Sequence, residues 1–231
     1  MELSKGEDRR ILAEGLILYF VLFFPGIYSS GFPGKIEHNG TIPFSTFMEL
    51  GRTMTYTVPS LALLWYLISL RKSTGEYSFS SLKLKNLQNN DFLSFIIGLP
   101  GIILIGLGVS LLVSLYSHSA PPPKIQAPGS VLGWLVMVFS CLSTGYLEES
   151  YFRYYILTAG VATPQPVTRA IFSIILFSLC HLYEGPWGVM NAVLAGSLLS
   201  ILFLRYRSLH GIAWAHGAYN IFIYSMGNFG A

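Results

Sequence analysis

The chain has 231 residues, of which 52% are hydrophobic and only 11% are charged, and its mean hydropathy is +0.55. A soluble globular domain carries about 25% charged residues, so this composition excludes an ordinary soluble domain and indicates a surface that mostly faces lipid. The formal net charge is +3 and no basic cluster is present. We therefore expect no nucleic-acid partner.

Seven apolar segments are long enough to cross a bilayer as helices, which takes about 17–25 residues. Closed β-barrels are the other spanning architecture, but they alternate polar and apolar residues, and these segments do not. The segments are Ile11–Tyr28, Thr53–Leu70, Phe92–Tyr116, Val131–Leu157, Val167–Tyr183, Trp187–Leu204 and Leu209–Met226. The sequence therefore predicts an all-α, polytopic membrane helical bundle with about seven transmembrane helices.

The Lys and Arg residues near the segment ends predict the orientation, because short cytoplasmic loops are enriched in them. With the N-terminus inside, most of them flank the inner ends, whereas Lys35, Arg52 and Lys124 flank the outer ends. We therefore expect an N-in/C-out topology. The first segment is expected to be a retained helix, since its apolar run is long for a signal peptide and no clear cleavage site follows.

Ionisable side chains gather in the last four segments and are nearly absent from the first three. Such residues are costly inside a bilayer, so they mark a functional site by default. The set comprises Glu148, Glu149, Arg153, His181 and His216, with the amides Asn191 and Asn220. At about 1.5 Å of rise per residue, the carboxylate, histidine and amide positions fall roughly 10–21 Å from the inner ends of their helices. The sequence therefore predicts one site near the middle of the bilayer.

Residue spacing assigns these side chains to helix faces. Residues four apart share a face, so Glu149 and Arg153 are expected to pair, and a purely structural pair is the alternative to a functional one. Glu148 is rotated by about 100° from its neighbour and needs another partner. His216 and Asn220 also share a face.

The chemistry that this set supports is the activation of water. A buried carboxylate near a cation can act as a base, and a facing histidine can hold and orient the water. A second histidine with an amide on the same face offers two donors to a developing oxyanion. The set holds no serine or cysteine nucleophile with an obvious base.

A zinc site is the alternative chemistry. Zinc accepts two histidines, one glutamate and a water, and His181, His216 and Glu148 offer that set, with Glu184 one turn after the first histidine. However, the chain lacks an H-E-x-x-H or related helix motif. We therefore expect neither a metal nor another cofactor.

Three short motifs follow one another on successive predicted helices. They are Glu148-Glu149-Ser-Tyr-Phe-Arg153, Phe177-Ser-Leu-Cys-His181 and His216-Gly-Ala-Tyr-Asn220. In this order they resemble the EExxxR, FxxxH and HxxxN motifs of the type II CAAX prenyl endopeptidase and bacteriocin-processing proteins, also called the Abi or CPBP family. The resemblance covers residues 143–225, about a third of the chain.

The resemblance implies a glutamate-dependent intramembrane endopeptidase that needs no metal. It also implies a role for each motif residue. Glu148 resembles the general base, His181 the group that helps to activate water, His216 and Asn220 the oxyanion pair, and Glu149 and Arg153 the pair that orients the site.

The expected partners are the lipid bilayer and a membrane-associated peptide or protein substrate, lipid-modified or sorted; the oligomeric state is left open. Residues 131–231 are the expected catalytic core, and residues 1–130 supply N-terminal transmembrane helices and loops of the same membrane domain. Short loops and the charge pattern favour a bacterial inner membrane. A non-catalytic membrane scaffold, a bacteriocin self-immunity protein and a transporter with a midplane site are the alternatives.

Overall fold

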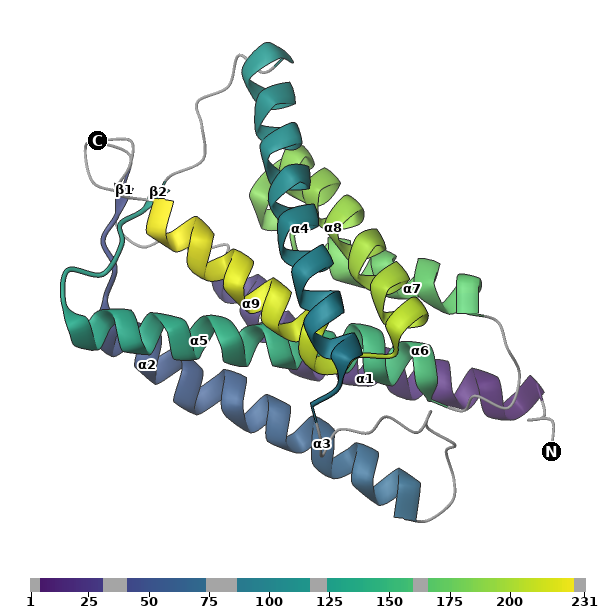
Figure 1. Ribbon diagram of the computed structural model, residues 1–231. Helices are drawn as coiled ribbons and strands as arrows, with labels where there is room; N and C mark the ends of the chain where they lie inside the picture. The colour runs from purple at the N-terminus through teal and green to yellow at the C-terminus, as the bar shows by residue number, and fades with distance from the viewer. Residues whose placement is uncertain (1–4, 31–40, 74–86, 117–123, 160–165, 227–231) are drawn as a thin grey trace.

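The computed structural model describes residues 5–30, 41–73, 87–116, 124–159 and 166–226. Within these ranges the chain is almost entirely helical, which confirms the predicted fold class (Figure 1). The strands found there are β1 (Thr41–Ile42) and β2 (Lys124–Ile125), which pair in parallel.

The helices and helical turns follow the predicted apolar segments closely. They are α1 (Lys5–Ser30), α2 (Thr46–Arg52), the π-helical η1 (Thr53–Thr57), α3 (Val58–Ser73), α4 (Asn89–Tyr116), α5 (Val131–Glu149), the π-helical η2 (Ser150–Tyr155), α6 (Ile156–Thr158), α7 (Pro166–Leu179), the 3₁₀ turn η3 (Leu182–Glu184), α8 (Gly185–Tyr206) and α9 (Leu209–Met226).

Four helical stretches in the described part of the chain are long and apolar enough to cross a membrane. They are Thr46–Lys72, Asn89–Tyr116, Val131–Thr158 and Leu182–Tyr206, and a shorter apolar helix covers Val167–Leu179. The chain is thus an integral membrane protein. Seven crossings and the N-in/C-out orientation stay predictions.

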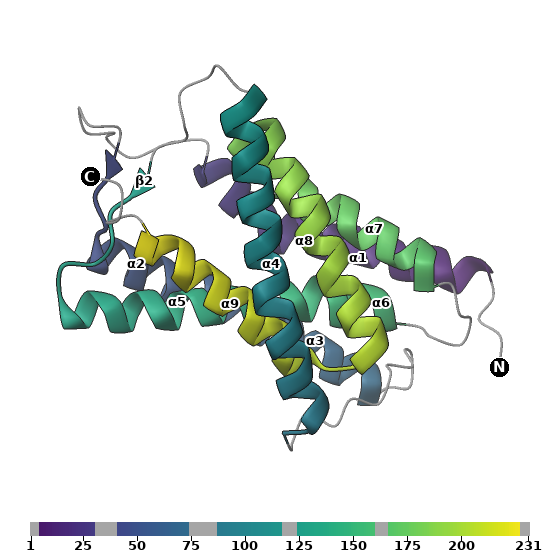
Figure 2. The same ribbon diagram turned by 45° about the horizontal axis from the view of Figure 1, so that its top comes forward.

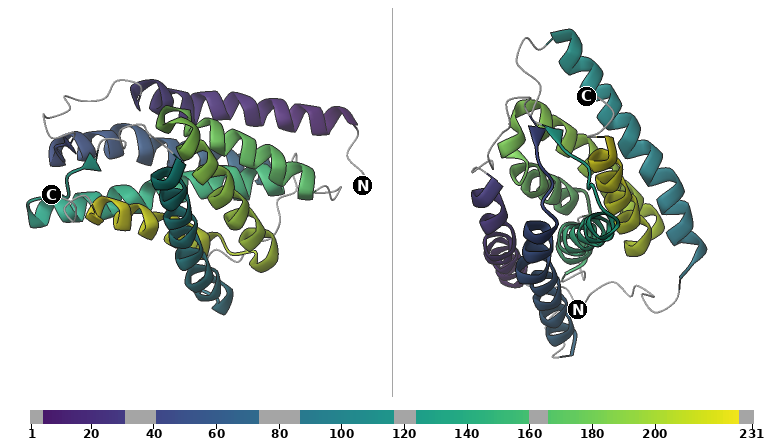
Figure 3. Two further views of the ribbon diagram at one scale, coloured as in Figure 1. Left: turned by 90° about the horizontal axis from the view of Figure 1, so that it is seen from above. Right: turned by 90° about the vertical axis from the view of Figure 1, so that its left-hand side faces the viewer.

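Helix α5 packs lengthwise against α9, and α4 crosses α9 and also packs against α8 (Figures 1 and 2). Helix α7 packs on α8, while α2 and α3 pack on α5. In the right view of Figure 3, α1 and α4 lie on opposite sides of the molecule, with α5 between them. Helix α5 is therefore the central element, in contact with helices from both ends of the sequence.

Polar contacts attach α1 to the segment that follows the two glutamates. The Tyr151 hydroxyl donates to the carbonyl of Gly15 at 2.6 Å, and Tyr155 donates to Glu14 Oε1 at 3.0 Å. Arg71 of α3 adds an ion pair to Glu14 at 2.7 Å. Apolar packing joins the same elements, because the hydrophobic core includes residues from α1, α3, α4, η2 and α8.

Glycines let α5 and α9 approach closely. A Cβ at Gly145 would lie 2.8 Å from the carbonyl oxygen of Ala213 and 3.0 Å from the amide nitrogen of Gly217. These are backbone atoms, so a side chain at Gly145 would force the two helices apart. The close approach brings the carboxylates at the end of α5 within reach of α9.

The expected fifth segment, Val167–Tyr183, is shorter as a helix than predicted, because α7 ends at Leu179. The amides of Cys180 and His181 bond to carbonyls three residues back, at 3.2 and 3.0 Å, which tightens the chain into a turn. Gly185, at φ 77°, then starts α8. His181 therefore lies in the turn between α7 and α8, outside the helix that the sequence suggested.

Candidate active site

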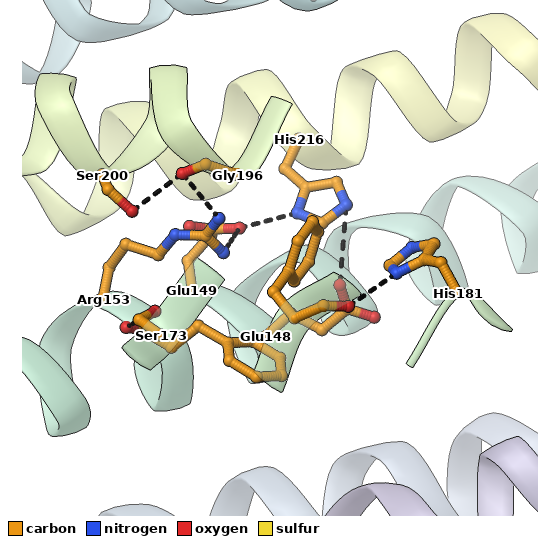
Figure 4. Close-up of polar contacts among 10 residues, drawn as sticks. Glu148, Glu149, Arg153, Ser173, His181, Gly196, Ser200 and His216 are labelled. Carbon is orange, nitrogen blue, oxygen red and sulfur yellow. Dashed lines mark hydrogen bonds and ion pairs between the residues drawn. The ribbon is translucent and has the colours of Figure 1, made fainter. Parts of the chain in front are cut away.

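Glu149 and Arg153 form the buried centre of the polar cluster, as their spacing predicts. Arg153 Nη1 donates to Glu149 Oε1 at 3.0 Å, and both side chains are 0% exposed. The same carboxylate oxygen lies 2.7 Å from His216 Nδ1 of α9. One oxygen of Glu149 thus joins α5, η2 and α9 (Figure 4).

Glu148 faces the other nitrogen of the same histidine. Its Oε2 lies 3.7 Å from His216 Nε2, which is longer than a hydrogen bond. Oε2 has no hydrogen-bond partner among the described residues, and the side chain is 18% exposed. As the sequence analysis expected, the bonds of Arg153 go to Glu149 and not to Glu148.

His181 is oriented by the turn that holds it. Its Nδ1 lies 2.9 Å from the carbonyl oxygen of Phe177, and its ring lies 4.7 Å from the Phe177 ring. A carbonyl only accepts, so Nδ1 carries the proton and the neutral ring has its lone pair on Nε2. In Figure 4, His181 lies on the Glu148 side of His216, and Arg153 on the Glu149 side.

The Arg153 guanidinium has further contacts that fix its plane. Its Nη2 donates to the carbonyl of Gly196 in α8 at 3.2 Å, and its Cζ lies 4.5 Å from the centre of the Phe177 ring. The Gly196 carbonyl also accepts from Ser200 Oγ at 2.7 Å. A Cβ at Gly196 would lie 3.0 Å from the Phe177 ring and 3.3 Å from Arg153 Nη2, so α8 approaches the site through a glycine.

A π-helical turn, η2, follows the two glutamates directly, where the sequence predicted an uninterrupted α-helix. Such turns are rare and are frequent at functional sites. Side chains of neighbouring helices support it, since Ser173 Oγ donates to the Phe152 carbonyl at 2.6 Å and Trp65 Nε1 donates to Ser150 Oγ at 3.2 Å. The spacing of apolar residues in the sequence does not reveal this change from an α-helix to a π-helix.

Asn220 is the sequence-predicted site residue that the structure leaves apart from the cluster. It lies one turn beyond His216 on α9 and is partly exposed. No hydrogen bond joins it to another predicted site residue in the described part of the chain. The other five predicted residues lie together, linked directly or, for His181, through Phe177.

No three His, Cys, Asp or Glu side chains among the described residues are grouped so that they could hold a metal ion. The set of the zinc alternative, His181, His216 and Glu148, is not among such groups in the described residues.

A second polar centre, which the apolar and motif patterns of the sequence do not reveal, lies two turns from Glu148 along α5. Arg52 of α2 pairs with Glu49 at 2.5 Å and donates to Ser140 Oγ at 3.0 Å, and Ser140 in turn donates to Glu49. From the sequence, Arg52 is expected only to flank the outer end of a segment. The missed signal is the spacing of Ser140, which precedes Glu148 by eight residues and so lies near the same helix face.

One family model matches the chain, and its match spans α5 to α9. Residues 130–222 match the model described as "Type II CAAX prenyl endopeptidase Rce1-like". No curated protein and no solved structure matches the chain. The matched segment contains all three motifs and the cluster around Glu149, so over these residues the chain is similar to a family of proteases, and the predicted family resemblance is confirmed.

Proposed function

We propose that this protein is a glutamate-dependent intramembrane endopeptidase in which Glu148 removes a proton from the water that attacks a peptide bond. The observation that carries the proposal is the pair formed by Glu148 Oε2 and His216 Nε2, 3.7 Å apart beside a buried ion pair. Groups at this separation can share a water molecule, because each can reach it at hydrogen-bond distance.

The buried contacts suit Glu148 to the role of the base better than Glu149. Oε2 of each glutamate lacks a protein partner among the described residues. Glu149 is 0% exposed and its Oε1 already accepts from Arg153 and His216, whereas Glu148 is 18% exposed and so more accessible to water. A general base must be within reach of the proton that it abstracts. His181 Nε2, an acceptor in the neutral ring, can hold the second hydrogen of the water.

The same contacts support an oxyanion role for His216. Its Nδ1 is bound to Glu149, so it can donate to an oxyanion only from a protonated Nε2. Glu149 orients the ring and stabilises the imidazolium form electrostatically, as a carboxylate beside a histidine does in other enzymes. Asn220, on the same face of α9, would be the second donor. Glu149 and Arg153 are then positioning residues.

The substrate that we propose is a membrane-associated peptide or protein, lipid-modified or sorted, that reaches the site from the bilayer or from its inner face. Glu148 lies within one candidate membrane span and His181 directly precedes another, which favours a substrate that is itself held at the membrane. A bacterial inner membrane is the setting that we propose for it.

The decisive experiment compares the wild type with Glu148→Gln on a library of membrane-anchored peptides, in native membranes or detergent. We expect cleavage to fall at least about a thousandfold, within the range by which loss of catalytic side chains slows proteases. Glu184→Gln, an exposed carboxylate in η3, is the matched control and should cleave at the wild-type rate.

A chelator arm separates the proposal from its zinc alternative. The proposal expects cleavage to be insensitive to chelator. If the chelator and the Glu184→Gln substitution both abolish cleavage, the zinc alternative is favoured. If the wild type and Glu148→Gln cleave equally well, the base is another residue. A binding phenotype that survives Glu148→Ala together with His181→Ala would favour the scaffold alternative.

A further inference from the structure

Side chains four residues apart on α7 hold the backbone that follows the two glutamates. Arg169 Nη1 donates to the carbonyls of Ile156 and Ala159. One turn further along α7, Ser173 Oγ donates to the carbonyl of Phe152 at 2.6 Å. Residues four apart lie on one face of a helix. A single face of α7 is therefore bonded to both η2 and the end of α6.

The same face continues to the candidate active site. Phe177 is four residues beyond Ser173, and its ring centre lies 4.5 Å from Arg153 Cζ. Its carbonyl oxygen lies 2.9 Å from Nδ1 of His181, which is again four residues further on. In Figure 4, Ser173 is drawn on the Arg153 side of the site and His181 on the Glu148 side. One face of α7 thus reaches both halves of the site.

The Ser173 hydroxyl bonds outside its own helix. A serine hydroxyl within a helix commonly donates to the carbonyl four residues back in the same helix. Ser178 of α7 and Ser200 of α8 both do so, at 2.7 Å. Ser173 is fully buried and donates instead to η2. Its bond is therefore a link between two elements in the interior of the molecule.

The acceptor of this bond belongs to the peptide unit that joins Phe152 to Arg153. This unit lies in the π-helical turn, where the amide of Ile156 bonds five residues back, to the carbonyl of Tyr151. A π turn departs from the regular hydrogen-bond ladder of an α-helix, and buried carbonyls need partners. Ser173 supplies a donor at the peptide unit that carries the arginine of the buried ion pair.

We infer that Ser173 is a positioning residue, which sets the register between η2 and α7 and thereby the placement of His181 relative to Glu148. Its bond holds the backbone of Arg153 against α7, and Phe177, on the next turn, holds the His181 ring. The inference rests on the proposed function, because it concerns the water that Glu148 and His181 would share.

Cys180 can report this placement without any cleavage. It directly precedes His181, and its Sγ donates to the Tyr19 hydroxyl of α1 at 3.5 Å. Alkylation by N-ethylmaleimide in detergent, followed by mass spectrometry, measures the accessibility of the thiol. We expect Ser173→Ala to raise the rate at Cys180 about tenfold, the effect of one lost buried hydrogen bond on a local opening. Cys141 of α5 is free and buried, and its rate should not change.

Two further variants sharpen the measurement. Ser173→Thr keeps the hydroxyl and should react at Cys180 as the wild type does. Ser178→Ala is the matched control, because it removes from the same helix a hydroxyl that bonds within that helix. An unchanged rate at Cys180 in Ser173→Ala, or Ser173→Thr behaving as Ser173→Ala does, would overturn the inference. An equal rise at Cys141 would also overturn it, because the substitution would then loosen the whole fold.

Kinetics test the same inference at the site. We expect Ser173→Ala to lower kcat about ten- to a hundredfold, the cost of misplacing a catalytic group by about 1 Å, and to leave KM unchanged. Against a His181→Ala background the same substitution should have little effect, since residues that act through one another are not additive. Equal fold losses in the two backgrounds would show that Ser173 does not act through His181.

The two measurements also separate this inference from the proposed function. If Cys180 responds to Ser173→Ala but neither the wild type nor any variant cleaves, the positioning role stands and the peptidase proposal fails. If the wild type cleaves through Glu148 and Ser173→Ala cleaves equally well, the peptidase proposal stands and the positioning role fails.

Discussion

Glu149 Oε1 accepts from two donors, Arg153 and His216, that come from different parts of the chain, while Glu148 faces only the far nitrogen of His216. Adjacent glutamates on one helix thus have different environments. Oε2 has no partner among the described residues in either glutamate. However, Glu149 is fully buried with both of its bonds on Oε1, whereas Glu148 is partly exposed. This difference is the physical reason for assigning positioning to Glu149 and proton transfer to Glu148.

Arg153→Ala should lower the free energy of unfolding by about 3–5 kcal/mol, since it leaves the buried carboxylate of Glu149 without its charged partner. Thermal or denaturant unfolding in detergent measures the change. Adding Glu149→Ala should cost less than the sum of the two single variants, because both act on one ion pair. Additive costs would contradict a coupled pair.

Helix α5 carries both glutamates and owes its placement to a close approach on α9. A Cβ at Gly145 would meet backbone atoms at 2.8 and 3.0 Å, which cannot move aside as a flexible side chain can. The contact is made one turn before Glu149, so a small separation of the helices would carry the carboxylate away from His216.

Gly145→Ala should therefore destabilise the protein by about 1–3 kcal/mol, the usual cost of overpacking, and should lower kcat at least about tenfold. Gly108→Ala on α4 is its control, because no atom lies within 4 Å of the added Cβ. Alanine there should be neutral or slightly stabilising in a helix. Unfolding midpoints and peptide cleavage measure both variants, and equal behaviour would show that the α5–α9 contact is not critical.

At the scale of the whole molecule, the N-terminal helices are part of the site's support although the family match begins at residue 130. Helix α1 bonds to Tyr151 and Tyr155 of η2, and α2 bonds to Ser140 of α5. The N-terminal helices therefore bond to the chain both before and after the two glutamates.

The predicted topology can be tested with the intact chain. A fluorescent protein fused at the N-terminus should be fluorescent in the cytoplasm, and alkaline phosphatase fused at the C-terminus should be active outside, if the chain crosses the bilayer seven times from an inner N-terminus. An active cytoplasmic reporter at both ends would require an even number of crossings. That result would make one of the seven segments, the short α7 first, a re-entrant helix.

The sequence alone determined the class of fold and the family resemblance, and it predicted a candidate site. The length of the apolar segments predicts membrane-spanning helices, because lipid offers no hydrogen-bond partners to the backbone and a helix satisfies its own. The spacing of Glu149 and Arg153 predicts their ion pair, because residues four apart lie on the same face of a regular helix. The three motifs then identified five residues that lie together in the structure.

Only the tertiary structure decided which helix faces meet. The bond between Glu149 and His216 joins residues 67 apart in the chain, and that between Arg52 and Ser140 joins residues 88 apart. Periodicity assigns a residue to a face of its own helix but does not identify the helix opposite. The turn at His181 and the π turn η2 also depend on contacts from neighbouring elements, such as the bond from Ser173 to the Phe152 carbonyl, and a local pattern cannot show them.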